Sequence, residues 1–347
     1  MGGCFFSGDD RVNEQISLAS MHTLFNREHN RIAMRLKKIN YHWNDRKLFQ
    51  ETRKIVGAIL QKISYEDYLP KIIGKDALLP FQYYQNDVNP GILNEFSTAA
   101  FRFGHSMIRP YFDLLDSGYN AVAQPFPLKK MFFNNIFIQK NGIEPILLGL
   151  LANVSQNVDP ILADGLTKHL FERKTLPGLD LAAINIQRGR DHGLSGYNKY
   201  RELCGLKIAK TFDDMSNEIK DVKIRNMLKK LYKTPQNIDL WVAGLAEDPL
   251  PDAAVGPTFQ CILKKQFTNL RDGDHFYYES KDVFTREQLR EIKKVTLSHI
   301  MCDNLLKIVS IQKDAFIAPT CEESRISCSR IQEHSMDLNA WKGKLQK

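Results

Sequence analysis

The sequence has no apolar run long enough to span a membrane, no internal repeat and no low-complexity segment. It also has no basic stripe interleaved with aromatic residues, which nucleic-acid-binding surfaces usually show. We therefore expect no membrane span and no nucleic-acid partner. The opening segment MGGCFFSGDD lacks a basic stretch followed by an apolar core, so no signal peptide is visible in it.

Cysteine is scarce, with 6 in 347 residues, and no CxxC pair or Cys/His cluster has the spacing of a zinc site. A structural zinc ion is therefore not expected. One Asn-x-Ser/Thr sequon, Asn153-Val-Ser155, is consistent with secretion, although such sequons are common by chance.

The composition indicates a globular chain, because 347 residues with 43% hydrophobic content can bury a large core. No linker separates two domains, so we expect a single, mostly helical domain over residues 1–347. Lys and Arg number 48 against 40 Asp and Glu, a formal charge of +8 that is spread along the chain. This pattern is typical of solvated helix faces.

Two long helices are predicted near the start of the chain. The first covers Glu14–Ile39, where apolar residues recur at helical spacing. The second begins near Arg46 and ends before Pro70, since proline has no N–H to donate within a helix. The residues expected on the buried side of the first helix are Ile16, Ala19, Met21, Leu24, Phe25, Ile32 and Leu36.

The segment FRFGHSMIRP, Phe101–Pro110, closes a helical pattern that begins at Gly91 and predicts one helix with His105 near its end. Gly104 would let a flat macrocycle approach the backbone, and the Phe and Met residues around His105 would keep water away. These features suit a proximal haem ligand. The alternative is a histidine packed in the core, which is the commoner role of a lone His on an apolar helix.

Four segments together resemble the animal haem peroxidases, the superfamily of peroxidasin and myeloperoxidase. They are RVNE at 11–14, SMHTLFNREHNR from Ser20, FRFGH ending at His105, and LAAINIQRGRDHGLSGYN from Leu181. The segments NIDLWVAGL, LRDGDHFYYE and IMCDN extend the resemblance to about residues 4–330, leaving a divergent tail at 331–347. It implies a mostly α, haem peroxidase-like domain that lacks the N-terminal part of the family's catalytic domain.

On the proximal side of the haem, the resemblance implies that His105 ligates the iron and that Asn185 accepts a hydrogen bond from its other ring nitrogen. Arg102 and Arg188 match contacts to the haem propionates, a role that suits the paired N–H donors of a guanidinium. For Arg102 the alternative is an ordinary surface ion pair. His192, in the motif RGRDHG, is expected to be structural, because the iron already has a better ligand.

On the distal side, Arg11 matches the arginine that stabilises charge on peroxide oxygen as the O–O bond breaks. Glu14 matches the glutamate that forms an ester with a haem methyl, so the implied cofactor is a b-type haem with an ester through Glu14. Gln15 stands where myeloperoxidase has a methionine joined to the haem, which excludes that linkage. The alternative for Arg11 and Glu14 is an i,i+3 ion pair at a helix start.

The resemblance also implies the disulfides Cys204–Cys261 and Cys302–Cys328, with Cys321 able to replace Cys328. Cys4 matches a cysteine whose partner in the family lies a short way upstream. Disulfides place the protein in an oxidising compartment, so we expect it to be extracellular.

The family's distal histidine, the aspartate of its second haem ester and its calcium loop all precede the Arg11 segment and have no counterpart here. We expect a peroxidase that uses H₂O₂ to oxidise halides or phenolic and other organic donors, with no calcium ligands of its own. The chain would be a poor catalyst alone, with the Glu14–Ile39 helix partly uncovered, unless an upstream segment or chain completes the domain. The alternative is a non-catalytic haem-binding or interaction module.

Overall fold

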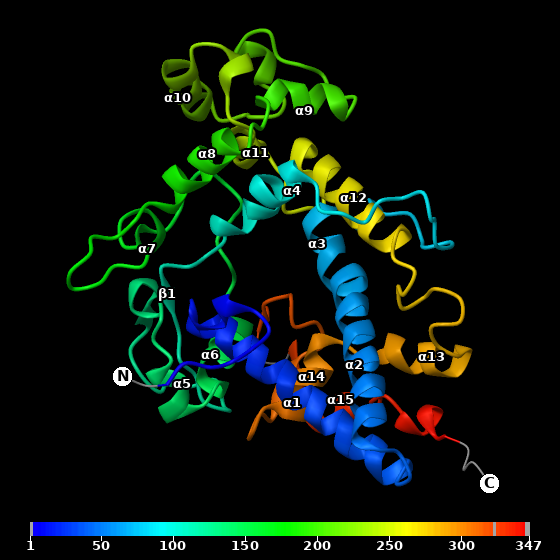
Figure 1. The fold of residues 1–347 in the computed structure, drawn as a ribbon. Coiled ribbons are helices and arrows are strands. Elements are labelled where there is room, and N and C mark those ends of the chain that lie inside the picture. Colours follow the sequence, from blue (N-terminus) through cyan, green and yellow to red (C-terminus); the bar gives the residue numbers. More distant parts are fainter. Residues whose placement is uncertain (1–2, 322–323, 344–347) are drawn as a thin grey trace. The chain divides into compact units, whose positions relative to one another are not determined.

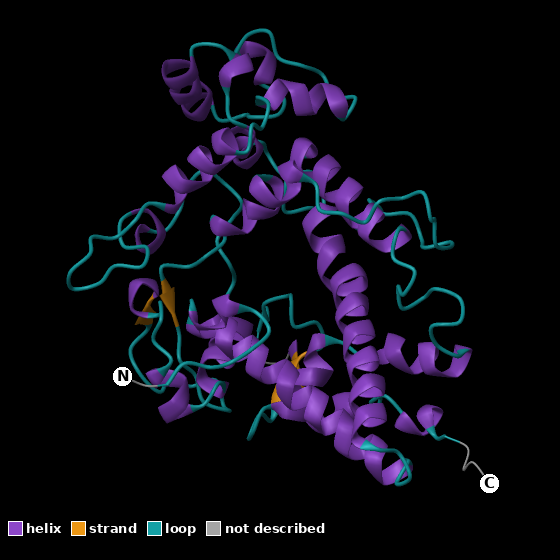
Figure 2. Ribbon diagram, in the orientation of Figure 1, coloured by secondary structure: helices purple, strands orange, loops and turns teal. Residues whose placement is uncertain are grey.

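The computed structural model describes residues 3–321 and 324–343 and is mostly helical, as expected (Figures 1 and 2). These residues form two compact units. The first comprises Met1–Tyr68, Tyr111–Val154 and Phe276–Lys347, and the second comprises Leu69–Pro110 and Ser155–His275. That residues 1–347 act as one domain stays a prediction.

The first unit is built on two long helices that pack against each other, α1 (Ile16–Ile39) and α2 (Asp45–Lys62) (Figure 1). Around them lie η1 (Asp10–Asn13), η2 (Ile63–Tyr68), η4 (Leu128–Lys130), α5 (Ile136–Asn141), α6 (Glu144–Ala152), α13 (Arg286–Lys294), α14 (Leu297–Asn304), α15 (Cys328–Gln332) and η8 (Leu338–Trp341). Two short antiparallel pairs complete it, β1 (Tyr111–Phe112) with β2 (Phe126–Pro127) and β3 (Ser310–Gln312) with β4 (Arg325–Ser327).

Helix α1 starts at Ile16, because the extended backbone and side chain of Gln15 cap its first turn. Most of the predicted core positions are at most 1% exposed, namely Ile16, Ala19, Leu24, Ile32 and Leu36, while Met21 and Phe25 are half-buried. The core-facing side of this helix is therefore covered, contrary to our expectation. Its exposed apolar residues are Leu18 and Met34.

The second predicted helix does not end before Pro70. It passes from α2 through the π-helix η2 into α3 (Leu69–Ile73), which contains Pro70. A proline cannot donate to the carbonyl four residues earlier and crowds it, whereas a π turn changes which carbonyls face the ring. The wider turn therefore allows the chain to stay helical across Pro70.

The second unit contains mostly short helices: α3, α4 (Asn94–Thr98), η3 (Ala100–His105), α7 (Asp164–Thr167), α8 (Leu181–Asp191), α9 (Tyr197–Leu203), η5 (Asp213–Met215), α10 (Val222–Tyr232), η6 (Pro235–Asn237), α11 (Leu240–Ala246) and α12 (Pro257–Asp272). One of its apolar cores joins the ends of α9, α10 and α11 through Tyr197, Leu228 and Ala243. Short helices of this kind depend on tertiary packing for their stability.

Two disulfides confirm the expected pairing. Cys204–Cys261 joins α9 to α12, and Cys302–Cys328 joins α14 to α15, while Cys4 and Cys321 are free and exposed. No helix among the residues that the structure describes is long and apolar enough to cross a bilayer.

The divergent tail packs against the rest of the first unit, although its sequence lacks the family resemblance. Met336, Leu338 and Trp341 are buried, and the side chain of Asn40 donates to the carbonyl of Trp341 at 3.0 Å. The described part of the tail, up to Gly343, is therefore part of the first unit.

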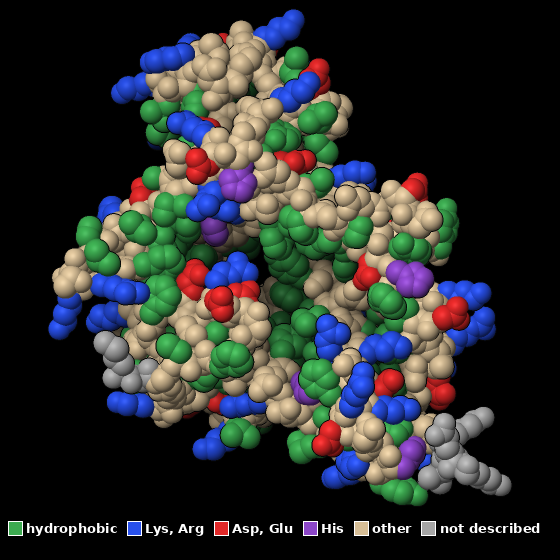
Figure 3. Space-filling view, in the orientation of Figure 1, with side chains coloured by type: hydrophobic (Ala, Val, Ile, Leu, Met, Phe, Trp, Pro, Cys, Tyr) green, Lys and Arg blue, Asp and Glu red, His purple; other side chains and the backbone are tan. Residues whose placement is uncertain are grey.

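The charge is dispersed over the surface. On the face drawn in Figure 3, Lys and Arg side chains lie scattered among acidic and apolar ones instead of forming one patch. This agrees with the spread of the +8 charge along the sequence.

Candidate functional site

His105 is the last residue of the 3₁₀ helix η3. The prediction of one continuous helix that begins at Gly91 and contains His105 is therefore wrong. The helix breaks at Ala99, whose backbone is non-helical with φ −132° and ψ −67°. The break lets Phe96 and Phe101 stack with ring centroids 4.7 Å apart, and Phe267 of α12 meets both rings edge-on. Aromatic pairs in these arrangements stabilise by about 0.5–1.5 kcal/mol beyond their burial.

The 3₁₀ geometry brings Arg102 and His105 onto one face, because residues three apart are eclipsed in a helix with three residues per turn. Nη1 of Arg102 donates to Oδ1 of Asn185 at 2.9 Å, and Nδ2 of Asn185 lies 2.8 Å from Nδ1 of His105. Asn185, in the middle of α8, is fully buried. The three side chains form one hydrogen-bonded chain between η3 and α8.

The motif RGRDHG fixes α8 in the position that the hydrogen bonds between η3 and α8 require. Arg190 pairs with Asp239 just before α11 through two bonds of 3.1 and 2.7 Å. Nδ1 of His192 lies 2.9 Å from Oδ1 of Asn94 at the start of α4. His192 thus has the structural role expected of it, and both contacts fix α8 against the neighbours of His105.

A third support comes from α11, where Nε1 of Trp241 donates to the carbonyl of Arg102 at 3.3 Å. Asp239 and Trp241 belong to the segment NIDLWVAGL, whose family resemblance did not reveal a role for either residue. Their signal was present as a polar and an aromatic residue flanking a short apolar run. Only the fold shows which backbone group they contact.

The ring of His105 is neutral at pH 7. Burial, and then the nearby charge of Arg102, lower the pKa of His105 from its ordinary 6.5 to about 4. A neutral imidazole can offer a lone pair to a metal, whereas a protonated one cannot. The environment therefore keeps the ring of His105 uncharged at neutral pH.

Two arginines of the second unit, Arg102 and Arg188, interact electrostatically. Burial, and then the charge of Arg188, lower the pKa of Arg102, which shows that the two positive charges act on each other. Among the described residues, no carboxylate forms an ion pair with either arginine within 4 Å. Like charges kept together in this way suit a ligand that carries carboxylates.

Arg11 and Glu14 belong to the first unit, and their predicted roles stay predictions. Arg11 is exposed and pairs with Asp9 through two bonds of 3.0 and 2.7 Å. The ion pair proposed as an alternative therefore joins Arg11 to Asp9 and not to Glu14. Glu14 is half-buried, and its N–H donates to the carbonyl of Arg11 at 2.8 Å.

The other histidines of the motifs do not form a metal site in the described chain. Nδ1 of His29 lies 3.3 Å from Oδ1 of Asn30, and its ring packs against Phe49. Within residues 3–321 and 324–343, no three His, Cys, Asp or Glu side chains are grouped to hold a metal ion. Haem iron needs only one protein ligand on its proximal side, so His105 alone suffices for it.

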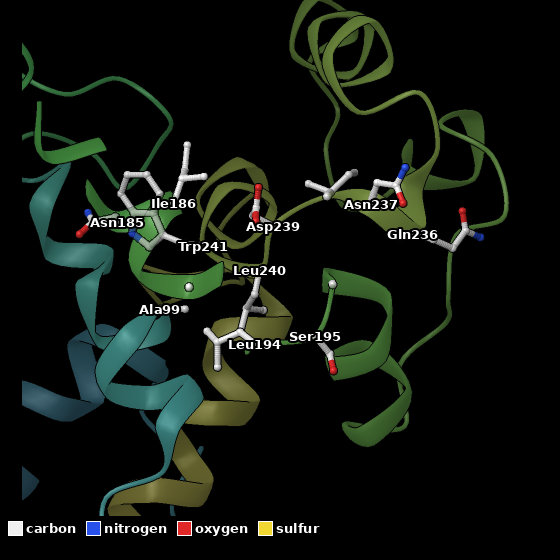
Figure 4. Close-up of a pocket in the computed structure, with 13 residues that line it drawn as sticks. Ala99, Asn185, Ile186, Leu194, Ser195, Gln236, Asn237, Asp239, Leu240 and Trp241 are labelled. Atoms are coloured by element: carbon white, nitrogen blue, oxygen red, sulfur yellow. The ribbon is translucent and has the colours of Figure 1, made fainter. Parts of the chain in front are cut away.

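A cavity of about 140 Å³ is lined by residues of α8 and α11 (Figure 4). Asn185 and Trp241 lie at one end of it and Gln236 and Asn237 at the other (Figure 4). Small-molecule sites typically enclose about 300–1,000 Å³, so this cavity is too small for a macrocycle. Asn185 lines this cavity, and His105 does not.

Comparison with known proteins identifies a family that this chain resembles over most of its length. The sequence profile of the animal haem peroxidase family matches residues 1–316. The peroxidasin homolog of Homo sapiens is 45% identical over 345 residues, which are 97% of this chain and 23% of that protein. Eosinophil peroxidase of Mus musculus is 43% identical over 350 residues, 98% of this chain and 48% of that protein.

Among solved structures, peroxidase A of Dictyostelium discoideum has a similar fold with a TM-score of 0.83 and 36% sequence identity. The match covers 90% of this chain and 59% of that one. The chain therefore spans less than half of the two curated relatives and somewhat more than half of the solved structure.

Proposed function

The chain belongs to the animal haem peroxidase family, and from that premise we propose that it binds a b-type haem through His105 and reduces H₂O₂ while oxidising a small donor. The donors proposed are halides and phenolic or other organic reductants. The observation that carries the proposal is the hydrogen-bonded chain Arg102–Asn185–His105. It joins a neutral histidine to Arg102, which interacts electrostatically with Arg188 and has no carboxylate partner among the described residues.

When bound, haem supplies an iron centre that activates the O–O bond of peroxide. His105 would hold the iron through Nε2, and Arg102 and Arg188 would bind the propionates. The residues fit the group in charge. The ring is neutral, and the two guanidinium groups favour an anion beside it.

Asn185 has a further task in this arrangement. Ligation through Nε2 requires the proton on Nδ1, and so an acceptor oxygen facing that nitrogen. In the structure Oδ1 of Asn185 faces Arg102, and Nδ2 faces His105. A carboxylate partner for Arg102 would release Oδ1, so that the amide could turn and accept from His105.

Arg11 is proposed to stabilise the charge that develops on peroxide oxygen, and Glu14 to form an ester with the haem. For this role the exposed Arg11–Asp9 pair would have to open, which costs little because water screens ion pairs at the surface. Calcium, which the resemblance implies for the intact domain, is assigned to no residue of this chain. An upstream segment or chain is proposed to supply the distal histidine.

The second candidate is a haem-binding module without turnover. The ion pair of Arg11 with Asp9 favours it, because the guanidinium is already occupied by two hydrogen bonds. Both candidates predict ligation by His105, and they differ in whether peroxide is consumed.

We further propose that the protein is secreted. Its two disulfides support this, because disulfides persist in oxidising compartments and are rare in the cytosol.

The experiment is haem titration of the 347-residue chain followed by its Soret absorption. His105→Ala should abolish the spectrum of histidine-ligated haem, and His169→Ala should preserve it because the ring of His169 pairs with Glu172. An unchanged spectrum in His105→Ala rejects the ligand assignment. Peroxide consumption by the loaded wild-type chain then separates the enzyme from the binding module.

A further inference from the structure

A cluster of three tyrosines lies in the first unit, where η2 meets the turn after α12. The rings of Tyr65 and Tyr277 meet edge-on with centroids 5.4 Å apart, and those of Tyr277 and Tyr278 are 4.9 Å apart. Tyr65 is half-buried, whereas Tyr277 and Tyr278 are 2% and 1% exposed. The rings form a continuous aromatic path from the surface to a buried phenol.

The buried end of this path has a base. The hydroxyl of Tyr278 donates a short hydrogen bond to Oε1 of Glu66, a side chain that is otherwise exposed. The backbone N–H of Tyr278 donates to Oε1 of Gln61 at 3.0 Å, which fixes the position of the ring. Glu66 can thus receive a proton from Tyr278 and pass it to water.

The π-helix is the reason that the ring contact and the carboxylate meet at one place. Tyr65 and Glu66 are consecutive in η2, and both reach the segment that carries Tyr277 and Tyr278. π-Helical turns are rare, and they are often found at functional sites.

The proton on this phenol is firmly held. Burial, and then the hydrogen bond to Glu66, raise the pKa of Tyr278 above its ordinary value of 10. The phenol is therefore neutral at physiological pH and would lose its proton only together with an electron.

We propose that Tyr278 is a site of reversible one-electron oxidation, reached through Tyr277 and Tyr65, with Glu66 as the proton acceptor. The oxidant is a one-electron acceptor that reaches Tyr65 from solvent, such as an organic phenoxyl radical. An electron leaves Tyr278 for this oxidant, the O–H bond of Tyr278 breaks, and its proton forms an O–H bond on Glu66. The products are the neutral tyrosyl radical, a protonated Glu66 and the phenolate of the oxidant.

The reverse reaction closes the cycle. A small reductant such as a phenolate supplies an electron through the same rings and becomes a phenoxyl radical, and Glu66 returns the proton to the tyrosyl oxygen. This proposal goes beyond haem binding and does not depend on it, since the oxidant arrives from solvent. A chain that fails to bind haem would still show the radical.

Another tyrosine provides a contrast within the same chain. The hydroxyl of Tyr232 donates to Oδ2 of Asp239 at 2.8 Å, but this carboxylate also pairs with Arg190 at 2.7 Å. A carboxylate held by a guanidinium is a weaker proton acceptor. Tyr232 therefore has the hydrogen bond without an equally available base.

The experiment is photo-oxidation of the 347-residue chain, without haem, by ruthenium tris-bipyridyl and a sacrificial electron acceptor. Electron paramagnetic resonance of samples frozen at successive times measures the yield and lifetime of the tyrosyl radical. We expect Tyr278→Phe to remove the long-lived radical and Tyr232→Phe to retain it. Glu66→Gln should slow radical formation about a hundredfold, the lower end of what a positioned base contributes.

The choice of variants also distinguishes loss of the radical from loss of the fold. Glu66 is exposed, so Glu66→Gln should keep the fold, which near-ultraviolet circular dichroism checks. A radical of unchanged yield and lifetime in Tyr278→Phe overturns the proposal, as does unchanged formation kinetics in Glu66→Gln. Equal losses in Tyr232→Phe and Tyr278→Phe would also overturn it, because the aromatic path would then have no role.

Discussion

Asn185 and His105 are 80 positions apart in the sequence, yet the amide Nδ2 of one lies 2.8 Å from the ring Nδ1 of the other. This contact depends on the 3₁₀ turn that ends at His105 and on the cross-links that position α8. It makes the protonation of His105 sensitive to changes in several neighbouring residues.

Acid should destabilise the protein through His105. The folded pKa of about 4 lies below the ordinary 6.5, so the unfolded chain binds more protons between these values. The contribution of His105 to stability is complete above about pH 6.5 and is lost as the pH falls toward 4, by at most about 3 kcal/mol. Urea unfolding at several pH values measures it.

The control is His105→Gln, which removes the titrating ring and keeps a polar side chain. Its free energy of unfolding should depend less on pH between 4 and 6.5 than that of the wild type. Identical pH profiles for the two proteins would show that His105 is not shielded from water as the structure indicates.

Arg102→Gln should raise the pKa of His105, since the positive charge of Arg102 is one of the two causes that lower it. The change should be smaller than the whole shift, because burial is the larger cause. Titration of the ring protons by nuclear magnetic resonance measures the pKa. Arg225→Gln is the control, since Arg225 donates to the carbonyl groups of Ile219 and Lys220 and should leave the value unchanged.

Removing Arg201 should destabilise the second unit by about 3–5 kcal/mol. Its guanidinium is 3% exposed and bonds the fully buried Glu247 at 2.9 Å, and Glu247 also accepts from Tyr197 at 2.6 Å. Arg201→Ala leaves that carboxylate without its charge partner. Denaturant unfolding measures the loss.

A matched control lies on the same helix, α9. Lys199 pairs with Glu202 at 2.7 Å, but both side chains are more than half exposed. Lys199→Ala should cost less than about 1 kcal/mol. Similar losses in the two variants would mean that the Arg201–Glu247 pair is not shielded from water.

The two disulfides should differ in their contribution to the free energy of unfolding. Cys204–Cys261 closes a separation of 57 residues and Cys302–Cys328 one of 26. Loop-closure entropy predicts about 4 kcal/mol for the first and about 3.5 kcal/mol for the second. Paired Cys→Ser variants and guanidinium unfolding compare them, and a larger loss from the shorter loop would contradict the entropic account.

Several features could be predicted from local sequence because they depend on near neighbours. The apolar spacing of Glu14–Ile39 predicted a helix whose buried residues include Leu24, Ile32 and Leu36. The spacing of three between Arg102 and His105 placed them on one face, and this holds although the predicted α-helix is a 3₁₀ helix. The disulfide pairs followed from the family resemblance and not from any local pattern.

Other features depend on residues that are distant in sequence, and only the tertiary structure decided them. The break at Ala99 depends on the packing of Phe267. The Asn185–His105 contact depends on Asp239 and Asn94, which hold α8 in place. The Tyr278–Glu66 hydrogen bond joins segments more than two hundred residues apart. Helical periodicity records which residues prefer burial within one element. It contains no information on which side chain of another element meets them, because that choice is made by packing and by the pairing of buried polar groups.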